Sequence, residues 1–426
     1  MTFERPGQAY VWIWLPGSEK PVVAGRLDEA GGEVSFVYGR SYLEREDRIS
    51  IYSPELPLVE QRIRPLPELS APGCILDAGP DAWGQRVIMN RLLGSEAART
   101  DPADLGTLSF LLESGSDRIG ALDFQASATE YVARERETAT LEELATSAER
   151  VDAGIPLTPA LDEALFRGSS IGGARPKALI DDGGRGLIAK FSSSTDTIAM
   201  VQGEYVAMEL GRRAGLDIAP VTIAKALGKA VLLVERFDRV ANTARRRALV
   251  SALTILELNE LAARWASYAE LAQVIRERFT QPSQSLRELF ARITLNILVG
   301  NTDDHARNTA AFWDGSALSL TPAYDICPQL RSGGEASQAM IIGDDSDSFR
   351  LSQLTGCVER AHIYQLSQAE AREIIDHQIA AIEDNWDDVC DRAELPEVER
   401  KRFWGRQFLN PFALEGYSTA STIEPL

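Results

Sequence analysis

The stretch SLRELFARITLNILVGNTDDHARN, residues 285–308, joins a helical pattern to a loop crowded with polar side chains. Ser285 and Glu288 fit a capping box and predict that the helix begins there. A Gly-Asn pair at 300–301 follows the helical pattern and is typical of a helix end. One apolar face at helical spacing is formed by Leu286, Leu289, Ile293 and Ile297. The sequence therefore places residues 302–308 directly after a packed helix, where functional side chains are often found.

The polar residues of this loop have an informative spacing. Asp303 and Asn308 are five residues apart, as are the catalytic aspartate and the metal-binding asparagine of a kinase catalytic loop. Downstream, LTPAYDICP places Asp325 after the strand-like segment at 318–320, where a carboxylate can complete a Mg²⁺ site with Asn308. For the loop alone, a helix-ending turn is the simpler interpretation, because Asp, Asn and Gly are common in such turns.

Two upstream segments favour a nucleotide. Lys190 ends the predicted strand GLIAKF, from which a lysine can reach ATP phosphates, and Glu204 on the next predicted helix is a candidate partner. A surface charge is the alternative interpretation of Lys190. The segment SSIGGARPK, residues 169–177, lacks the spacing of a P-loop. Its Gly172–Gly173 pair would nevertheless let backbone N–H groups approach a phosphate closely.

The order of predicted elements indicates an α+β fold. The first 60 residues contain three short segments typical of strands, at 10–15, 32–38 and 48–52, and residues 79–93 have helical spacing. A second β-rich block follows a polar linker at 126–150, and it contains one predicted helix at 197–214. After residue 250 the pattern is mainly helical. A small β-lobe before a helical lobe is the kinase arrangement, although many α+β proteins share it.

From this order we predict three domains. Residues 1–125 form a β-rich N-terminal module, residues 126–240 a small lobe with the phosphate loop and Lys190, and residues 241–426 a helical large lobe. The large lobe would carry both the catalytic loop and Asp325.

Composition excludes some classes of protein. The 426-residue chain has a net charge of −19 and a sequence pI near 4.8, which disfavours direct nucleic-acid binding and suits a basic protein partner, or solubility alone. Its four cysteines form no CxxC pair, so they predict neither a zinc knuckle nor a disulfide framework. We see no secretory signal and no apolar run long enough to span a bilayer, so the expected location is the cytoplasm.

Several motifs occur in the order found in the HipA-type toxin kinases of bacteria, and over about residues 10–385 the chain resembles that family. The motifs of the kinase region are SSIGGARPK, IAKF, LLVERFDR, GNTDDHARN and PAYDI. Those of the N-terminal region are GRL at 25–27, SFVYGRSYL at 35–43, PDAWGQR at 80–86 and GALDF at 120–124. The resemblance implies a two-lobed, protein-kinase-like fold of the HipA type, with ATP and Mg²⁺ as cofactors.

The resemblance also implies residue roles. Asp303 would be the catalytic base, and Asn308 and Asp325 would bind Mg²⁺. Ser170 would be a regulatory autophosphorylation site, with Ser169 as a second candidate acceptor, because a phosphoserine adds charge to a loop that must hold phosphates. A simple turn hydroxyl is the alternative for Ser170. The implied nucleotide-binding residues are Gly172, Gly173, Ala174, Lys177, Lys190, Glu235, Phe237, Asp238 and His305. The chain departs from many members at Arg307, where they carry lysine, and this changes the donor geometry.

The activity implied is that of a serine/threonine protein kinase acting as the toxin of a type II toxin-antitoxin system. Its target would be a translation component such as an aminoacyl-tRNA synthetase. Its partner would be a small helix-turn-helix antitoxin like HipB, through which it would reach DNA indirectly, with no membrane involved. Two other readings stay open: a catalytically silent, nucleotide-binding co-repressor, and a phosphotransferase acting on a lipid or small molecule.

Overall fold

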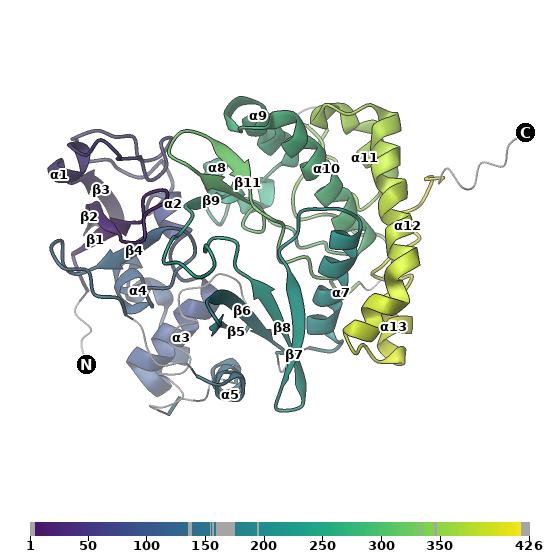
Figure 1. Ribbon diagram of the computed structural model, residues 1–426, viewed down its shortest axis with the longest axis horizontal. Helices are drawn as coiled ribbons and strands as arrows, with labels where there is room; N and C mark the ends of the chain where they lie inside the picture. Colours follow the sequence, from purple (N-terminus) through teal and green to yellow (C-terminus); the bar gives the residue numbers. More distant parts are fainter. Residues whose placement is uncertain are drawn as a thin grey trace, which may run out of the picture. The chain divides into compact units, whose positions relative to one another are not determined.

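The chain folds into two compact units, drawn in the computed structural model of Figure 1. Unit 1 consists of Met1–Thr195, Ala224–Val250 and Phe312–Ser316. Unit 2 consists of Asp196–Ile223, Ser251–Ala311 and Ala317–Leu426. The structure describes residues 5–134, 139–153, 155, 157–158, 175–193, 196–331, 334–344 and 347–418.

Unit 1 begins with a four-stranded antiparallel sheet in the order β3-β2-β1-β4. Its strands are β1 (Gln8–Ile13), β2 (Val22–Ala30), β3 (Glu33–Tyr38) and β4 (Leu122–Gln125). Strand β4 lies more than 80 residues after β3 along the chain. Its pairing with β1 therefore brings the two ends of the N-terminal module together in one sheet. Fully buried side chains from three strands line that core: Val11, Phe36 and Phe124.

The strand predicted at 48–52 is wrong. These residues form turns and irregular backbone whose polar groups are satisfied by tyrosine hydroxyls instead of a neighbouring strand. The Tyr42 hydroxyl donates to the Ile49 carbonyl at 2.8 Å, and the Ile51 amide donates to the Tyr38 hydroxyl at 3.0 Å. A pattern of apolar residues cannot show that side-chain hydroxyls, and not a neighbouring strand, bond the backbone groups.

The helices of unit 1 follow local capping signals. Asp81 caps α3 (Ala82–Leu93) by accepting from the Trp83 and Gly84 amides, and Thr140 and Glu143 form a capping box at the start of α5 (Leu141–Asp152). The other helices are short: α1 (Arg40–Leu43), α2 (Gly73–Leu76), η1 (Gly94–Arg99), η2 (Pro102–Asp104) and α4 (Thr107–Glu113).

A second antiparallel sheet has the order β5-β6-β8-β7. Its strands are β5 (Lys177–Asp182), β6 (Arg185–Phe191), β7 (Val221–Ala226) and β8 (Lys229–Glu235). One face packs against α3 and α5, in a core that includes Trp83, Val87, Leu144, Ala148, Ala178, Ala189, Phe191 and Val231. Successive side chains of a strand point to opposite faces, so Lys177 and Lys190, which are register partners, share the other face.

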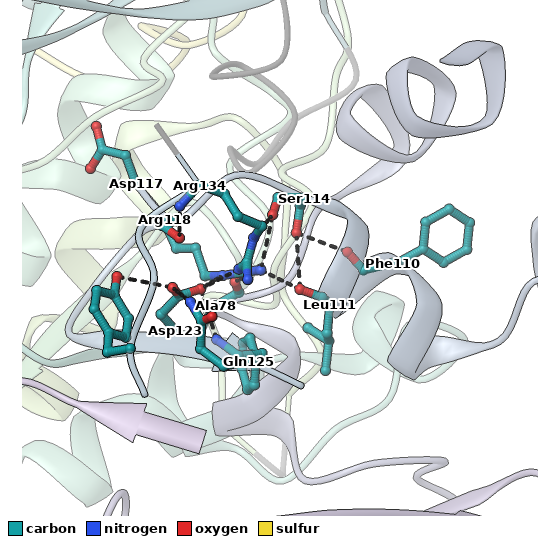
Figure 2. A network of polar contacts seen from close by, with 12 residues as sticks. Ala78, Phe110, Leu111, Ser114, Asp117, Arg118, Asp123, Gln125 and Arg134 are labelled. Atoms are coloured by element: carbon teal, nitrogen blue, oxygen red, sulfur yellow. Dashed lines mark hydrogen bonds and ion pairs between the residues drawn. The ribbon is translucent and has the colours of Figure 1, made fainter. Parts of the chain in front are cut away.

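A buried ion-pair network lies beside β4 (Figure 2). Arg118 donates to Asp123 at 2.8 Å with neither side chain exposed, and Arg134 donates to the same carboxylate at 2.7 Å. The Arg118 carbonyl in turn accepts from Arg236, which follows β8, at 2.7 Å. The N-terminal module and the second sheet are therefore joined by buried charges inside one unit.

Unit 2 is mainly helical, as predicted for the chain after residue 250. Helix α12 packs against α7 and α10, and α9 packs against α10 (Figure 1). Among the described residues, no helix is long and apolar enough to cross a membrane. The helical segments are α7 (Met200–Arg213), α8 (Ala252–Ile255), η4 (Ala263–Trp265), α9 (Tyr268–Arg278), α10 (Pro282–Leu298), α11 (Leu354–Glu359), η5 (Ala361–Tyr364), α12 (Gln368–Arg392) and α13 (Glu397–Phe403).

The predicted start of α10 is wrong by one turn. The helix begins at Pro282, which suits the first helical position because its missing N–H would have had no partner there. Ser285 is thus inside the helix, and Glu288 pairs with Arg292 at 2.8 Å instead of closing a capping box. The end agrees with the prediction, since α10 stops at Leu298 and Gly300 has a φ of 71°.

A short three-stranded sheet has the order β11-β10-β9. Its strands are β9 (Leu249–Ser251), β10 (Ala310–Trp313) and β11 (Leu318–Leu320). The four cysteines are all buried as free thiols: Cys74, Cys327, Cys357 and Cys390.

Candidate active site

The polar loop after α10, residues 300–309, is held by backbone hydrogen bonds. Its turns are closed by the His305 amide, which donates to the Asp303 carbonyl at 2.8 Å, and by the Asn308 amide, which donates to the His305 carbonyl at 2.8 Å. The Asn308 side-chain Nδ2 donates to the Asp303 carbonyl at 3.2 Å. This orientation leaves the Asn308 Oδ1 as an acceptor, which is the atom that a cation would need.

A chain of buried polar side chains lies under Asp303. The Tyr268 hydroxyl and the Asn296 Nδ2 both donate to the Asp304 carboxylate, the latter at 2.8 Å. The Asn301 Nδ2 donates to Asn296 Oδ1 at 2.9 Å, and the Asn301 Oδ1 accepts from the Asp303 amide at 3.3 Å. Since Tyr268, Asn296, Asn301 and Asp304 are all buried, this chain fixes the backbone from which the Asp303 side chain projects.

The Asp303 carboxyl itself is exposed to solvent, unlike that of Asp304. Partial desolvation raises its pKa above the ordinary value, His305 lowers it and the negative charge of Asp325 raises it further. An acid with a raised pKa accepts a proton more readily at neutral pH, as a general base must. The pKa of Asp303 thus responds to the charge of Asp325, as expected if both carboxylates belong to one site.

The segment carrying Asp325 is tied to the same loop and to α10. The Tyr324 hydroxyl donates to the Arg307 carbonyl at 2.7 Å, and Arg292 on α10 donates to the Thr321 carbonyl at 2.8 Å. Asp325 has a φ of 59°, a conformation uncommon for a residue other than glycine, and such outliers cluster at functional sites. These contacts tie the segment that carries the predicted metal carboxylate to the loop that carries the predicted base.

The donor chemistry of Asn308 and Asp325 fits Mg²⁺. Both offer oxygen, the ligand type that Mg²⁺ prefers, and substrate phosphates and waters usually complete its six positions. Within the described residues there is no group of three or more His, Cys, Asp or Glu side chains that could hold a metal alone.

The C-terminal segment supports the start of the loop. The Leu409 amide donates to the Leu298 carbonyl at 2.8 Å, and a Cβ on Gly300 would lie 2.7 Å from the Gln407 carbonyl oxygen. The Gln329 amide donates to the Gly300 carbonyl at 2.9 Å, and Gln407 Nε2 donates to the Gln329 carbonyl at 3.3 Å. Residues 407–409 thus contact both the catalytic-loop segment and the segment after Asp325.

Apart from His305, which lies in unit 2, the predicted nucleotide residues belong to unit 1, and only some of them are described. Lys190 is partly exposed on β6, opposite Lys177 on β5. Lys177 is buried, with its Nζ 3.8 Å from Asp81, and its carbonyl accepts from Trp83 Nε1 at 2.9 Å. The predicted phosphate-loop residues fall outside the described part of the chain: Ser169, Ser170, Gly172, Gly173 and Ala174.

Three further residues of the implied nucleotide-binding set have different surroundings: Glu235, Phe237 and Asp238. Glu235 ends β8 with its side chain partly exposed. Phe237 packs edge-on against Phe312, with ring centroids 5.9 Å apart. Asp238 is only 2% exposed, and its carboxylate accepts from Arg236 and Arg239, each at 2.8 Å, and from the Gly120 amide at 2.7 Å.

The Asp238 carboxylate is held by charged partners within unit 1. Although burial opposes the change, Arg236 and Arg239 lower the pKa of Asp238, so it is a fully engaged carboxylate. These contacts link the N-terminal module to the second sheet. The nucleotide-binding role of Asp238 stays a prediction.

Sequence reasoning missed several residues of the site. Tyr268 and Asp304 are 36 positions apart, and no local pattern links them. Asn296 offered a signal, since a lone amide within the apolar run TLNILVG requires a buried partner. No sequence signal indicated the contribution of Gln407, because its partners, Gly300 and the Gln329 carbonyl, are more than 70 residues away along the chain.

Comparison with known proteins identifies the family. Residues 13–125 match the HipA N-terminal domain, and residues 169–386 match the HipA-like C-terminal domain. The chain belongs to the HipA family. Its matched regions include the catalytic loop and Asp325 but end before α13 and residues 407–409.

Two curated relatives are similar to this HipA-family chain. "Putative kinase Y4mE" of Sinorhizobium fredii (strain NBRC 101917 / NGR234) is 24% identical over 341 residues, which is 74% of this chain and 76% of the relative. "Toxin YjjJ" of Escherichia coli (strain K12) is 24% identical over 184 residues, which is 40% of each chain.

A solved structure with the same fold is HipA of Shewanella oneidensis MR-1, determined with HipB and operator DNA. The TM-score is 0.61 at 17% identity, over 94% of this chain and 99% of that one. The predicted α+β fold of the HipA type is confirmed.

Proposed function

We propose that this HipA-family chain is an ATP- and Mg²⁺-dependent serine/threonine protein kinase that acts as the toxin of a type II toxin-antitoxin system. The observation that carries the proposal is that one loop presents both Asp303 and Asn308, while the segment of Asp325 is tied to this loop and its charge acts on the Asp303 carboxyl. Membership of the family and the kinase and toxin named among its relatives support it.

In the proposed reaction the acceptor hydroxyl attacks the γ-phosphorus of ATP, an O–P bond forms, and the bond to ADP breaks. Asp303 orients the hydroxyl and accepts its proton. Asn308 and Asp325 would hold Mg²⁺, which when bound neutralises charge on the phosphates. Lys190 would contact the phosphates, with Gly172, Gly173, Ala174 and Lys177 of the phosphate-loop region, while Glu235 and Phe237 would meet adenine. His305 would lie near the phosphates.

Regulation and partners belong to the same proposal. Ser170, or Ser169 beside it, would be the autophosphorylation site. A HipB-like helix-turn-helix antitoxin would be the partner, because the similar Shewanella protein was solved with HipB and operator DNA. The net charge of −19 suits a basic DNA-binding partner in the cytoplasm, so DNA contact would be indirect. An aminoacyl-tRNA synthetase is the proposed kind of target.

Asp303→Asn tests the proposal, with γ-labelled ATP and Mg²⁺ as reagents. The wild-type protein should transfer label to itself or to a protein, and the variant should lose at least a hundredfold in rate, since general base catalysis contributes on the order of 10²–10⁴. Both proteins should unfold at the same temperature, because the Asp303 side chain is exposed.

The other outcomes identify the alternatives. A fully active variant would refute Asp303 as the base. A wild-type protein that binds ATP but transfers no label would be the silent co-repressor, and label found only on lipid or a small molecule would define a different phosphotransferase.

A further inference from the structure

The segment between β9 and α9, residues 252–268, is bonded to the catalytic loop at both ends, and we call it the anchored segment. At its start, the Ala252 amide donates to the Thr309 carbonyl at 2.7 Å and the Leu253 amide donates to the Ala306 carbonyl at 3.1 Å. At its end, the buried Tyr268 hydroxyl donates to Asp304. Any chain that approaches the catalytic loop therefore also approaches this segment.

The middle of the anchored segment has its own link to the loop. The Arg307 Nε donates to the Glu260 carboxylate at 2.6 Å, and Arg307 immediately precedes Asn308. Because the pair is exposed at the surface, it adds little to the free energy of unfolding. Its main effect is to fix the position of Glu260 relative to the loop. It keeps residues 260–265 close to the loop that carries Asp303.

Two large apolar side chains of this segment face solvent. Leu261 is 84% exposed and Trp265 is 62% exposed. Their backbone is ordered by local bonds: the Ala262 amide donates to Asn259 Oδ1 at 2.8 Å, and η4 follows directly. A held turn that presents leucine and tryptophan to water is typical of a surface that another molecule covers, since tryptophan is enriched at interfaces and in their hot spots.

The charges around these side chains narrow the choice of partner. Between residues 252 and 270 there are three acidic residues and one basic residue, a net charge of −2. Glu257, Glu260 and Glu270 are exposed, while the Arg264 guanidinium lies 5.3 Å from the Trp265 ring centroid. Arg307 pairs with Glu260, and Arg350 donates to the Arg264 carbonyl at 2.9 Å, so Glu257 is the acidic residue of this segment that remains to attract a basic residue of a partner. The surface thus complements a polypeptide that carries an apolar side chain with a basic residue near it.

We infer that Leu261 and Trp265 bind the acceptor segment of the protein substrate, by receiving a large apolar side chain near the phosphorylated serine or threonine. A basic residue that flanks this side chain is attracted by the exposed Glu257, whereas Glu260 is already paired with Arg307. The inference rests on the proposed kinase function and names part of its specificity. The acceptor is favoured over other occupants because its hydroxyl must come within hydrogen-bond reach of Asp303, so its chain has to cross the catalytic loop.

The test uses synthetic peptides with one central serine or threonine, in which each flanking position is varied in turn, together with labelled ATP and the full chain. The wild-type protein should prefer a large apolar residue at one position and Lys or Arg nearby. The double variant Leu261→Ser, Trp265→Ala should lose that apolar preference and show at least a tenfold rise in peptide KM, with autophosphorylation and ATP binding unchanged.

Val398→Ser is the matched control. Val398 is 70% exposed on α13, so its replacement also removes an exposed apolar side chain from unit 2, and it should leave peptide selection as in wild type. Thermal unfolding of all three proteins checks that the fold is intact.

Three results would overturn the inference: the double variant keeps the apolar preference, the wild type labels peptides without one, or the wild type labels itself but no peptide. If the double variant instead loses binding of a copurified antitoxin while peptide selection persists, the surface serves that partner and the inference is wrong. A wild type that transfers no label to anything refutes the kinase proposal itself, which is a separate outcome.

Discussion

At the scale of single residues, Asp303 and Asp304 are neighbours with opposite surroundings. The exposed Asp303 is free to meet a substrate, whereas Asp304 is buried and accepts from Tyr268 and Asn296. The spacing to Asn308 is that of a kinase catalytic loop, and it predicts that Asp303 is the base. Nothing local predicted Asp304, because its partners come from α9 and α10 and only tertiary packing brings them together.

Burial raises the pKa of Asp304 to about 6, against the effect of the Tyr268 hydrogen bond. A folded-state pKa above the unfolded value gives stability that is complete below the unfolded pKa and is lost as pH rises through about 6. Asp304→Asn cannot ionise, so its free energy of unfolding should rise relative to wild type between about pH 4 and 7, by up to about 3 kcal/mol.

Urea unfolding of both proteins across that pH range measures this difference. Parallel stability curves would show that the Asp304 carboxyl does not hold its proton more tightly in the folded state. Phosphoryl transfer, measured at pH 7, reports separately whether the neutral amide still supports the backbone of Asp303.

At the scale of elements, the site depends on where α10 ends. The sequence predicted this end correctly, since Gly300 marks a helix stop, but it did not predict why the glycine is required. The reason is tertiary: residues 407–409 lie against it, and the family match ends at residue 386. The start of α10 was mispredicted because a proline at the first helical position outweighed a capping-box pattern one turn later.

Gly300→Ala should both destabilise the protein and slow phosphoryl transfer. The new Cβ would lie 2.7 Å from the Gln407 carbonyl oxygen, and alanine is strained at a φ of 71°, so we expect a loss of about 2–4 kcal/mol. Thermal unfolding and a rate measurement at saturating ATP check the two effects.

Gly405→Ala is the control, because Gly405 has a φ of 73° but open space around its Cα. It should cost only the backbone strain, about 1 kcal/mol, and leave the rate unchanged. Equal effects of the two substitutions would show that the contact with residue 407 does not matter.

At the scale of the whole molecule, the order of predicted elements was sufficient to predict the fold class. It was not sufficient to predict how the chain divides into compact units. Three domains were predicted, whereas the chain forms two compact units, and the three-domain division stays a prediction about sequence segments. Both family-matched regions contribute to unit 1. Side chains far apart in sequence, such as Arg118 and Arg236, make this connection, and their pairing could not be inferred from either segment alone.

Asp238→Ala should strongly destabilise the protein. It removes a buried acceptor from Arg236 and Arg239 and leaves buried positive charge with fewer partners, at a cost of about 3–5 kcal/mol. Asp182→Ala removes an exposed partner of Arg185 and should cost less than about 1 kcal/mol. Urea unfolding of the two variants gives the comparison, and similar losses would contradict a structural role for Asp238.

The covered thiols have a practical consequence. All four cysteines are packed beneath other side chains, so a maleimide dye added to the native protein should find little to react with. A single cysteine placed on the surface, for example at Trp265 or Val398, would then be the main point of attachment. The fluorescence of a dye at this position could be followed during turnover, and the four buried cysteines would not first have to be replaced.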